Sequence, residues 1–218
     1  MISELIKLSK SSSKYVIGAE GNVSCRFDNG FYIKASGKSL ENLSEKDLVF
    51  CNEDGTYDES SGLRPSIETS FHAWLFKNIP DINYISHTHP VNTLKVLCSS
   101  EVYNFSKKRL FPDQVVFNGI ESCLVEYHHP GEDLLNGLKN SFNAYFDKHQ
   151  SIPKIILLKN HGIITFGKTI NECIISSDIC EKSSEIFLGS LFKPSYLSNY
   201  YVNRIVNDEN EKYRQNIN

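Results

Sequence analysis

Three histidines in this sequence have the spacing and the neighbours that a divalent metal ion requires. His87 and His89 end an apolar segment and are two residues apart. Side chains two apart on a strand project to the same face, so these imidazoles can converge on one ion. His161 follows a second apolar segment and precedes Gly162, which permits a sharp turn or the close approach of another group. Three nitrogen ligands with a fourth position open are typical of a catalytic zinc ion.

A second interpretation of the same residues is that they bind nothing. The spacing of His87 and His89 is common, and His161 can be a core histidine satisfied by hydrogen bonds. The presence of two such strand ends in one chain favours the metal site. His72 is expected to pack or to hydrogen-bond, and the other histidines are expected at the surface: His128, His129 and His149.

Glu68 is the candidate acid–base group. It is predicted in the first turn of a helix that Ser66 caps, where a carboxylate also interacts favourably with the helix dipole. Close to a metal ion, the same carboxylate acts either as a ligand or as a proton acceptor.

Two turns with glycine are candidates for binding an anion: residues 18–22 and residues 35–37. Backbone N–H groups in such turns can form a nest for phosphate, assisted here by Asn22, Lys34 and Ser36. Both sequences are also ordinary turn chemistry. The chain has neither a GxGxxG fingerprint nor a Walker-type loop, which excludes dinucleotide-binding and P-loop chemistry.

Composition and charge restrict the class of protein. The 218 residues are 40% hydrophobic and 22% charged, and one domain over residues 1–218 is expected. A net charge of -3 argues against a nucleic-acid partner, and no apolar segment is long enough to cross a membrane. The N-terminus lacks the pattern of a signal peptide, and six scattered cysteines are expected to be reduced. We therefore expect a cytoplasmic protein.

Strands and helices that alternate along the chain have to position these residues. The patterns predict strands at residues 22–27, 31–34, 47–50, 82–87, 115–117, 123–127, 154–159 and 163–166. They predict helices at residues 2–8, 66–79, 91–98, 132–146 and 169–191. Intermixed strands and helices favour an α/β sandwich built on one mixed sheet.

Five segments taken in chain order resemble the class II aldolase/adducin family. They are GAEGNVS, IKASG, RPSIETSFH, HTHP and LLKNHG, and they extend from Gly18 to about Gly167. The resemblance implies a three-layer α/β/α sandwich around one mixed, largely antiparallel sheet. It also implies a homotetramer with active sites at the subunit interfaces, and a carbon–carbon lyase that cleaves a small ketose phosphate or a related sugar acid by retro-aldol chemistry.

The resemblance implies a role for each matched residue. The metal, Zn2+ or alternatively Mn2+ or Co2+, is held by His87, His89 and His161, and Glu68 acts at the metal and in proton transfer. The substrate anion is bound by Asn22, Lys34, Ser36, Gly37 and Ser66. Asp113 lies where a related sugar-phosphate 4-epimerase has a catalytic aspartate.

One residue departs from the family pattern, and the C-terminal tyrosines allow two interpretations. Ile67 stands where the family often has a second serine, so the substrate can lack a phosphate or hold its acid group differently. The C-terminal tyrosines are similar to a tail that reaches a neighbouring active site, with packing as the alternative: Tyr196, Tyr200, Tyr201 and Tyr213.

Other activities use the same family framework. A 4-epimerase would use the same bond cleavage and is favoured by Lys34 and Asp113, and a dehydratase or decarboxylase would use the same metal chemistry. A non-catalytic, adducin-like interaction module is a further alternative. Retention of the three histidines and the acid argues against the module.

Overall fold

The computed structural model describes residues 1–190 and 193–217, with side chains through Tyr213. Seven strands of this part form one sheet in the spatial order β3–β2–β1–β4–β7–β6–β5. Neighbouring strands are antiparallel except β5 and β6, which are parallel. The strands are β1 Asn22–Phe27, β2 Gly30–Lys34, β3 Leu48–Asn52, β4 Tyr84–Thr88, β5 Cys123–Val125, β6 Ile155–Leu158 and β7 Gly162–Gly167. The predicted mixed, largely antiparallel sheet is confirmed.

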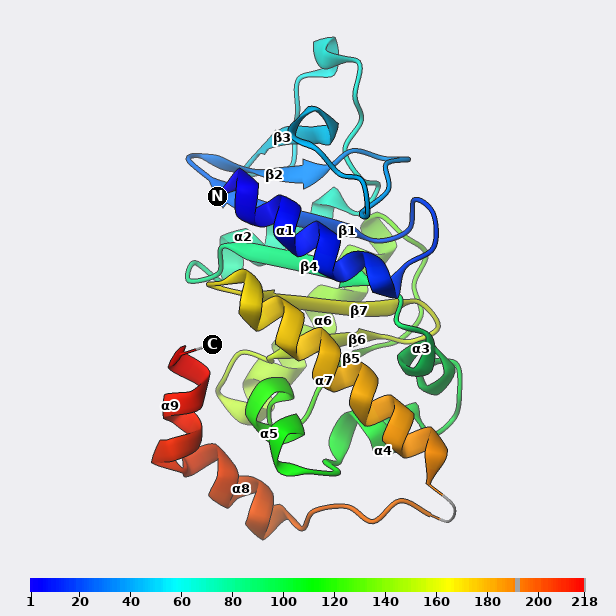
Figure 1. The fold of residues 1–218 in the computed structure, drawn as a ribbon, viewed down its shortest axis with the longest axis vertical. Coiled ribbons are helices and arrows are strands. Elements are labelled where there is room, and N and C mark those ends of the chain that lie inside the picture. Colours follow the sequence, from blue (N-terminus) through cyan, green and yellow to red (C-terminus); the bar gives the residue numbers. More distant parts are fainter. Residues whose placement is uncertain (191–192, 218) are drawn as a thin grey trace.

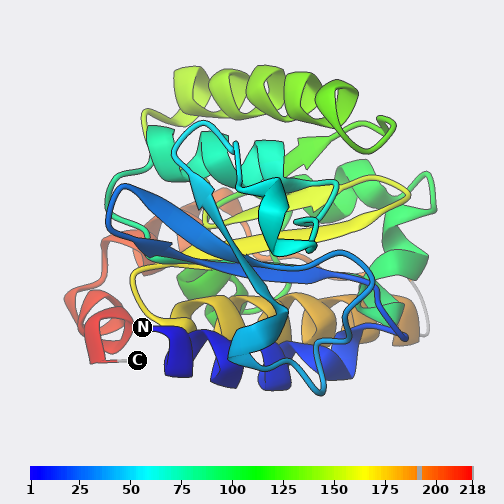
Figure 2. The same ribbon diagram turned by 90° about the horizontal axis from the view of Figure 1, so that it is seen from above.

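Helices cover both faces of this sheet (Figures 1 and 2). On one face lie α2 Thr69–Asn78 and α6 Glu132–His149, and on the other lie α1 Ile2–Ser12 and α7 Ile170–Gly189. The shorter helices are α3 Val91–Leu97, α4 Val102–Lys107, α5 Pro112–Asn118, α8 Asn199–Asn207 and α9 Glu209–Ile217, and the 3-10 turns are η1 Ser13–Tyr15, η2 Glu45–Asp47 and η3 Glu59–Ser61. Figure 2 shows the three predicted layers, with the sheet between the two sets of helices.

Strand β4 distributes its side chains between the two helical layers. Ile85 belongs to the core cluster under α2 and α6, whereas Tyr84 belongs to the cluster under α1. Ser86 faces α1, where its hydroxyl lies 3.0 Å from that of Ser12. His87 must therefore face α2, since neighbours on a strand point to opposite faces, and its ring contacts Phe71 of α2.

The predicted strand at residues 115–117 is wrong, because these residues lie inside α5. Pro112 occupies the first turn of this helix, where its fixed φ favours helix and its missing N–H has no cost. Val115 and Val116 are buried, so the β-branched pair that is typical of a strand instead forms the buried side of a short helix. Helices α4, α8 and α9 were not expected, and the predicted end of the last long helix at Leu191 lies outside the described residues.

The cysteines are free and mostly buried. Cys98 alone among the six is exposed, and burial raises the pKa of Cys25, Cys51 and Cys123 to about 12. Such thiols stay protonated and behave as small apolar side chains. No helix in the described part of the chain has the length and apolar character needed to span a membrane.

Candidate metal centre

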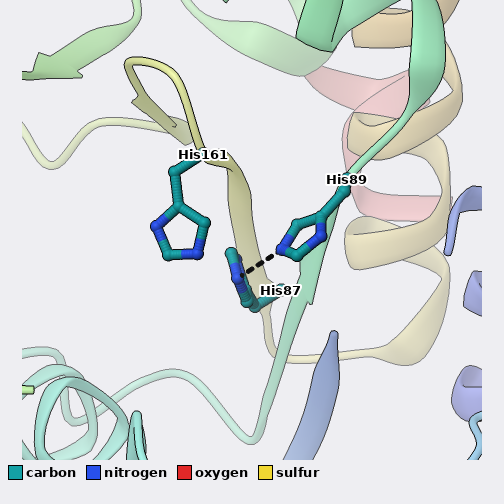
Figure 3. A group of neighbouring side chains, drawn as sticks. All are labelled: His87, His89 and His161. Atoms are coloured by element: carbon teal, nitrogen blue, oxygen red, sulfur yellow. Dashed lines mark hydrogen bonds between the residues drawn. The ribbon is translucent and has the colours of Figure 1, made fainter. Parts of the chain in front are cut away.

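The three histidines predicted as ligands lie together at one end of the sheet (Figure 3). His87 is in β4 and His89 follows the end of that strand, while His161 lies in the turn between β6 and β7. Strands β4 and β7 are neighbours, so these strand ends are adjacent although the residues are distant in sequence. One ligand nitrogen from each ring lies within 4.8 Å of the other two. The convergence expected from the sequence is present.

Gly162 permits this convergence because no side chain fits at its position. A Cβ there would lie 2.5 Å from the carbonyl oxygen of Thr88 and 2.6 Å from Cδ2 of His89. It would also lie 3.3 Å from Cε1 of His87. The groups that approach Gly162 closely, as predicted, therefore include the rings of His87 and His89.

The orientation of each ring leaves a ligand nitrogen facing the centre. His87 donates its Nδ1–H to the backbone oxygen of Ile163 at 2.9 Å, which leaves a lone pair at Nε2. Nε2 of His89 lies 3.0 Å from Nε2 of His87. A divalent cation would displace the proton that these two nitrogens share. His89 can then direct Nδ1–H at the carboxylate of Glu20, which lies 3.5 Å away. Contacts of this kind fix the tautomer of a metal-binding histidine.

Burial keeps these rings neutral, which is the form that binds metal. Desolvation, reinforced by the neighbouring rings, lowers the pKa of His87 to about 3 and that of His89 to about 4. Desolvation also lowers the pKa of His161, against the attraction of Glu68. At neutral pH the rings are therefore uncharged, so metal binding requires a change of tautomer at His89 but no net release of a proton.

Glu68 completes a set of donors that fits a cation. Its Oε2 lies 3.2 Å from Nε2 of His87, and its Oε1 lies 3.3 Å from Nε2 of His161. The side chain is buried, and Oε1 has no hydrogen-bond partner. A buried carboxylate oxygen without a partner is costly, and a divalent ion held by the histidines would compensate for it. Burial raises the pKa of Glu68, which suits a group that accepts a proton, although His161 and Asn22 oppose the shift.

Ser66 does not cap helix α2, so that prediction is wrong. The helix begins at Thr69, and Glu68 is the residue before it rather than a residue of its first turn. The hydroxyl of Ser66 instead accepts from Nδ2 of Asn22 at 3.1 Å and from the backbone N–H of Glu68 at 3.3 Å. Both contacts place Ser66 beside the candidate acid.

The two candidate anion turns are joined by Lys34. Its buried ammonium donates to the carbonyl oxygen of Ala19 at 3.0 Å and to that of Lys38 at 2.6 Å. Burial lowers the pKa of Lys34 to about 8. A β-bridge between Ala35 and Pro65 brings the second turn alongside the segment that leads to Ser66.

The residues predicted to bind the substrate anion thus lie in neighbouring segments of the fold. The backbone N–H of Ser36 donates to the carbonyl oxygen of Arg64 at 2.8 Å, and Gly37 has a left-handed φ of 76°. Asn22 begins β1 and pairs with His87 of β4. Ile67 is 71% exposed, between Ser66 and Glu68, so an apolar side chain stands in the open beside the candidate acid.

Asp113 is not brought to the histidines within this chain. It lies in the first turn of α5, which packs against α7 and α8. Helix α7 covers the face of the sheet opposite the one to which His87 points. The C-terminal tyrosines lie on the same side as α5, with Tyr200, Tyr201 and Tyr213 exposed and Tyr196 under the ammonium of Lys108.

Several residues that support the centre were missed from the sequence. Glu20 faces His89 from the first anion turn. Glu181 of α7 accepts the backbone N–H groups of Asn92 and Thr93 at 2.9 and 2.8 Å, and so caps α3 immediately after His89. The sequence around α3 does not indicate this cap, because Glu181 is 89 positions away from Asn92. His72 is buried and hydrogen-bonded, as expected.

Comparison with known proteins gives one consistent family. The model of the Class II Aldolase and Adducin N-terminal domain matches residues 4–188. An L-fuculose phosphate aldolase of Methanococcus maripaludis is 28% identical over 187 residues, which are 85% of this chain and 94% of that protein. A 3-oxo-tetronate 4-phosphate decarboxylase of Pectobacterium atrosepticum is 27% identical over 200 residues, 90% of this chain and 88% of that protein. An L-fuculose 1-phosphate aldolase structure superposes with a TM-score of 0.75 at 18% identity, covering 97% of this chain and 95% of that one.

Proposed function

The chain belongs to the class II aldolase and adducin N-terminal domain family and is a metal-dependent aldolase, and we propose that it cleaves a small ketose phosphate or a related sugar acid. The proposed reaction is a retro-aldol cleavage that yields two smaller carbonyl compounds. The observation that supports it is the meeting of three neutral imidazoles and one buried carboxylate at adjacent strand ends.

His87, His89 and His161 would hold the metal in this proposal, with Zn2+ preferred and Mn2+ or Co2+ as alternatives. When bound, the divalent ion supplies Lewis-acid polarisation of a substrate carbonyl oxygen. The side chains of His89 and His161 are 18% and 16% exposed, so a substrate can approach the centre from solvent. The chain's own residues then have to bind and orient the substrate and to transfer a proton.

Glu68 is the proposed proton-transfer group. The pKa of Glu68 is raised towards neutral pH, and a general acid or base is most effective when its pKa lies near the working pH. Both carboxylate oxygens of Glu68 lie close to the histidine nitrogens, so an ion held by the histidines would also lie within reach of this carboxylate.

The two turns would hold the anionic end of the substrate. The ammonium of Lys34 supplies the positive charge between them, and Ser36, Gly37 and Ser66 offer hydroxyl and backbone donors. Asn22 reaches both Ser66 and Glu68, so it would link the anion site with the proton-transfer group. Fixing the substrate at one end orients the bond to be cleaved at the other.

Two related reactions remain as second candidates. The match to a decarboxylase over 90% of this chain favours decarboxylation, which needs the same stabilisation of negative charge on a carbonyl oxygen. The resemblance of Lys34 and Asp113 to residues of a related 4-epimerase favours an epimerase. The adducin-like interaction module is the least favoured, because such a module does not need neutral histidines around a buried carboxylate.

We also propose a cytoplasmic homotetramer of single-domain chains, with active sites at the subunit interfaces. Asp113 and the C-terminal tyrosines would then act from a neighbouring copy. The packing of α5 against α7, on the face of the sheet opposite the one to which His87 points, supports this arrangement.

The direct test of the function is the Glu68→Gln variant. We expect this variant to bind the metal as the wild type does and to lose turnover, because the amide cannot accept a proton. Release of free aldehyde by the wild type, measured with a coupled reductase, separates an aldolase from an epimerase that retains the aldehyde. Full activity of Glu68→Gln would remove Glu68 from the mechanism.

A further inference from the structure

His72 is a buried titratable side chain close to the centre that the proposed mechanism does not use. It lies on α2, one turn after Glu68, and none of its surface is exposed. Its ring stacks on Phe71 with centroids 4.5 Å apart. Burial lowers the pKa of His72 well below its usual value, so the ring is neutral and carries a single N–H.

A chain of buried hydrogen bonds runs from β1 through His72 to Glu68. The hydroxyl of Ser24 lies 2.7 Å from Nδ1 of His72, and Nε2 of His72 lies 2.6 Å from Oδ1 of Asn22. Nδ2 of Asn22 then donates to Oε2 of Glu68 at 2.8 Å. Ser24 and Asn22 are 0% and 2% exposed, so water cannot replace a lost partner.

Only one assignment of donors satisfies this chain while Glu68 is ionised. A carboxylate only accepts hydrogen bonds, so Asn22 must present its NH2 group to Glu68. Oδ1 of Asn22 then faces His72, whose Nε2 must carry the proton. Nδ1 of His72 is left as an acceptor, and Ser24 is the group that donates to it. The reverse assignment would direct Oδ1 of Asn22 at the charged oxygen of Glu68.

We propose that His72 is a positioning residue, whose Nε2–H holds the Asn22 amide in the orientation that donates to Glu68, and that Ser24 fixes the required tautomer. Asn22 in turn fixes the carboxylate of Glu68 relative to Ser66 and the histidines. This proposal rests on the proposed function, since turnover is one of its readouts. It concerns the orientation of Glu68, whereas the three histidines are held without His72, which makes no hydrogen bond to His87, His89 or His161.

The decisive variants change the donor at residue 72 and keep a side chain of similar length. His72→Phe preserves a planar ring without an N–H, and we expect kcat to fall about 10- to 100-fold, as supporting contacts of a site usually cost. His72→Gln places an amide N–H near the position of Nε2, and we expect it to recover part of that loss. KM and the metal content are expected to stay close to wild type in both.

Ser24→Ala tests the tautomer separately. The alanine leaves His72 in place and removes the donor to Nδ1, so kcat is expected to fall with KM unchanged. Ser177→Ala is the matched control, since Ser177 is a buried serine of α7 that bonds to Thr165 and the carbonyl oxygen of Cys173. We expect it to leave kcat unchanged.

Crystal structures of the variants make the test independent of turnover. The contact between Nδ2 of Asn22 and Glu68 should persist in His72→Gln and Ser177→Ala and be broken in His72→Phe. A His72→Phe enzyme with wild-type kcat, or with Asn22 still bonded to Glu68, would overturn the proposal, as would a loss of kcat that His72→Gln does not reduce. If the wild type has no lyase activity, the proposed function is refuted. The positioning role still holds in that case if the contact between Asn22 and Glu68 is present in the wild type and broken in His72→Phe.

Discussion

Lys34 is a buried cation whose charge is weakened by its surroundings. Removal from water lowers its pKa from 10.5 to about 8. Between these two values the unfolded chain binds more protons than the folded chain, so the contribution of Lys34 to the free energy of unfolding rises with pH there. For an anionic substrate the direction is opposite, because the attractive ammonium form is lost as the pH rises through about 8.

We therefore expect the KM for an anionic substrate to rise above about pH 8. In Lys34→Met, KM should already be high at pH 7 and should not show this increase. Steady-state kinetics between pH 6.5 and 9.5 on both proteins would measure the difference. A wild-type KM that is independent of pH over this range would exclude Lys34 from anion binding.

Gly162 is the residue at which a single methyl group should disturb the metal centre most. We expect Gly162→Ala to destabilise the fold by about 1–3 kcal/mol, as overpacking does, and to weaken metal binding at least about 10-fold by displacing His89. Thermal unfolding and metal titration would measure the two effects.

Gly189→Ala is the matched control, since a Cβ at this position on α7 meets nothing within 4 Å. It should leave metal affinity unchanged and should not destabilise the fold. Equal metal affinity of Gly162→Ala and wild type would show that the close contact with His89 is not needed.

The convergence of the histidines could be predicted from the sequence because His87 and His89 end one apolar segment and His161 follows another, and strand ends in one sheet are few. The close approach of other groups to Gly162 could also be predicted, because a glycine directly after a candidate ligand leaves room for them. The contact between Asn22 and Glu68 could not be predicted, since it joins residues 46 positions apart. Ser66 shows a second limit, because a serine before a helical pattern indicates a cap, and here its hydroxyl is used by Asn22.

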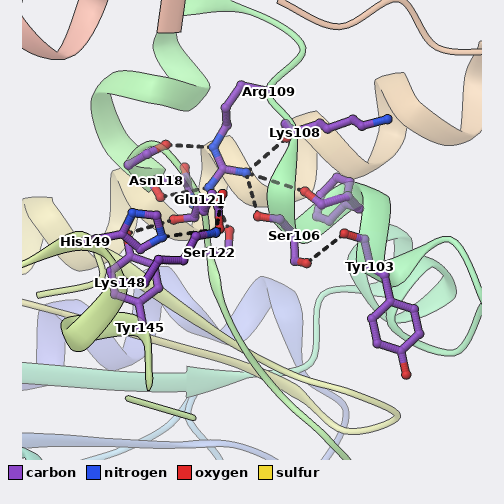
Figure 4. Close-up of polar contacts among 12 residues, drawn as sticks. Tyr103, Ser106, Lys108, Arg109, Asn118, Glu121, Ser122, Tyr145, Lys148 and His149 are labelled. Atoms are coloured by element: carbon purple, nitrogen blue, oxygen red, sulfur yellow. Dashed lines mark hydrogen bonds and ion pairs between the residues drawn. The ribbon is translucent and has the colours of Figure 1, made fainter. Parts of the chain in front are cut away.

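At the scale of elements, Arg109 organises the segment from α4 to β5 (Figure 4). Its guanidinium is buried and donates only to neutral groups: the backbone oxygens of Phe105, Ser106, Lys108, Asn118 and Gly119, and the hydroxyl of Ser122. Burial lowers its pKa to about 10, so it remains charged at neutral pH. Among the described residues no carboxylate forms an ion pair with it.

Arg109→Lys is expected to lower the free energy of unfolding by at least about 2 kcal/mol. An ammonium has three donors and lacks the planar fork, so several of the buried carbonyl groups would lose their partner. Arg204→Lys on the exposed side of α8 is the control, with an expected change within about 0.5 kcal/mol. Urea unfolding of both variants measures the effect, and equal stabilities would contradict this role of Arg109.

The helices around Arg109 are also where prediction from the sequence was weakest. Val115, Val116 and Phe117 are typical of a strand, and only tertiary packing on α7 makes this segment a helix. Helix α4 has six residues and is too short to give a clear period. The longer α6 and α7 and the strands β1, β2, β6 and β7 were predicted within a few residues, because their patterns are sustained.

For the whole molecule, the main expectation is that each site contains residues of two chains. Asp113 lies in α5, which packs against α7 on the face of the sheet opposite the one to which His87 points, and we expect it to serve a centre in a neighbouring copy. The sequence of one chain does not reveal such a contact, because no pattern along the chain marks which two surfaces of identical subunits meet.

Subunit mixing tests this arrangement. We expect His89→Ala and Asp113→Asn to be inactive separately, and an equal mixture of the two, after exchange of subunits, to recover about a quarter of the wild-type activity. This fraction is the chance that a random neighbour pair supplies both intact residues. A mixed oligomer, verified by mass, that stays as inactive as its parents would show that Asp113 does not act across the interface.

The proposed reaction depends most on one divalent ion held by residues from distant parts of the chain. The direct measurement is the metal content per chain of purified wild type and His161→Ala after incubation with Zn2+, Mn2+ or Co2+ and removal of the excess. We predict about one bound ion per wild-type chain and a large loss in His161→Ala. A wild type that retains no ion, or a variant that retains as much as the wild type, would contradict the metal centre.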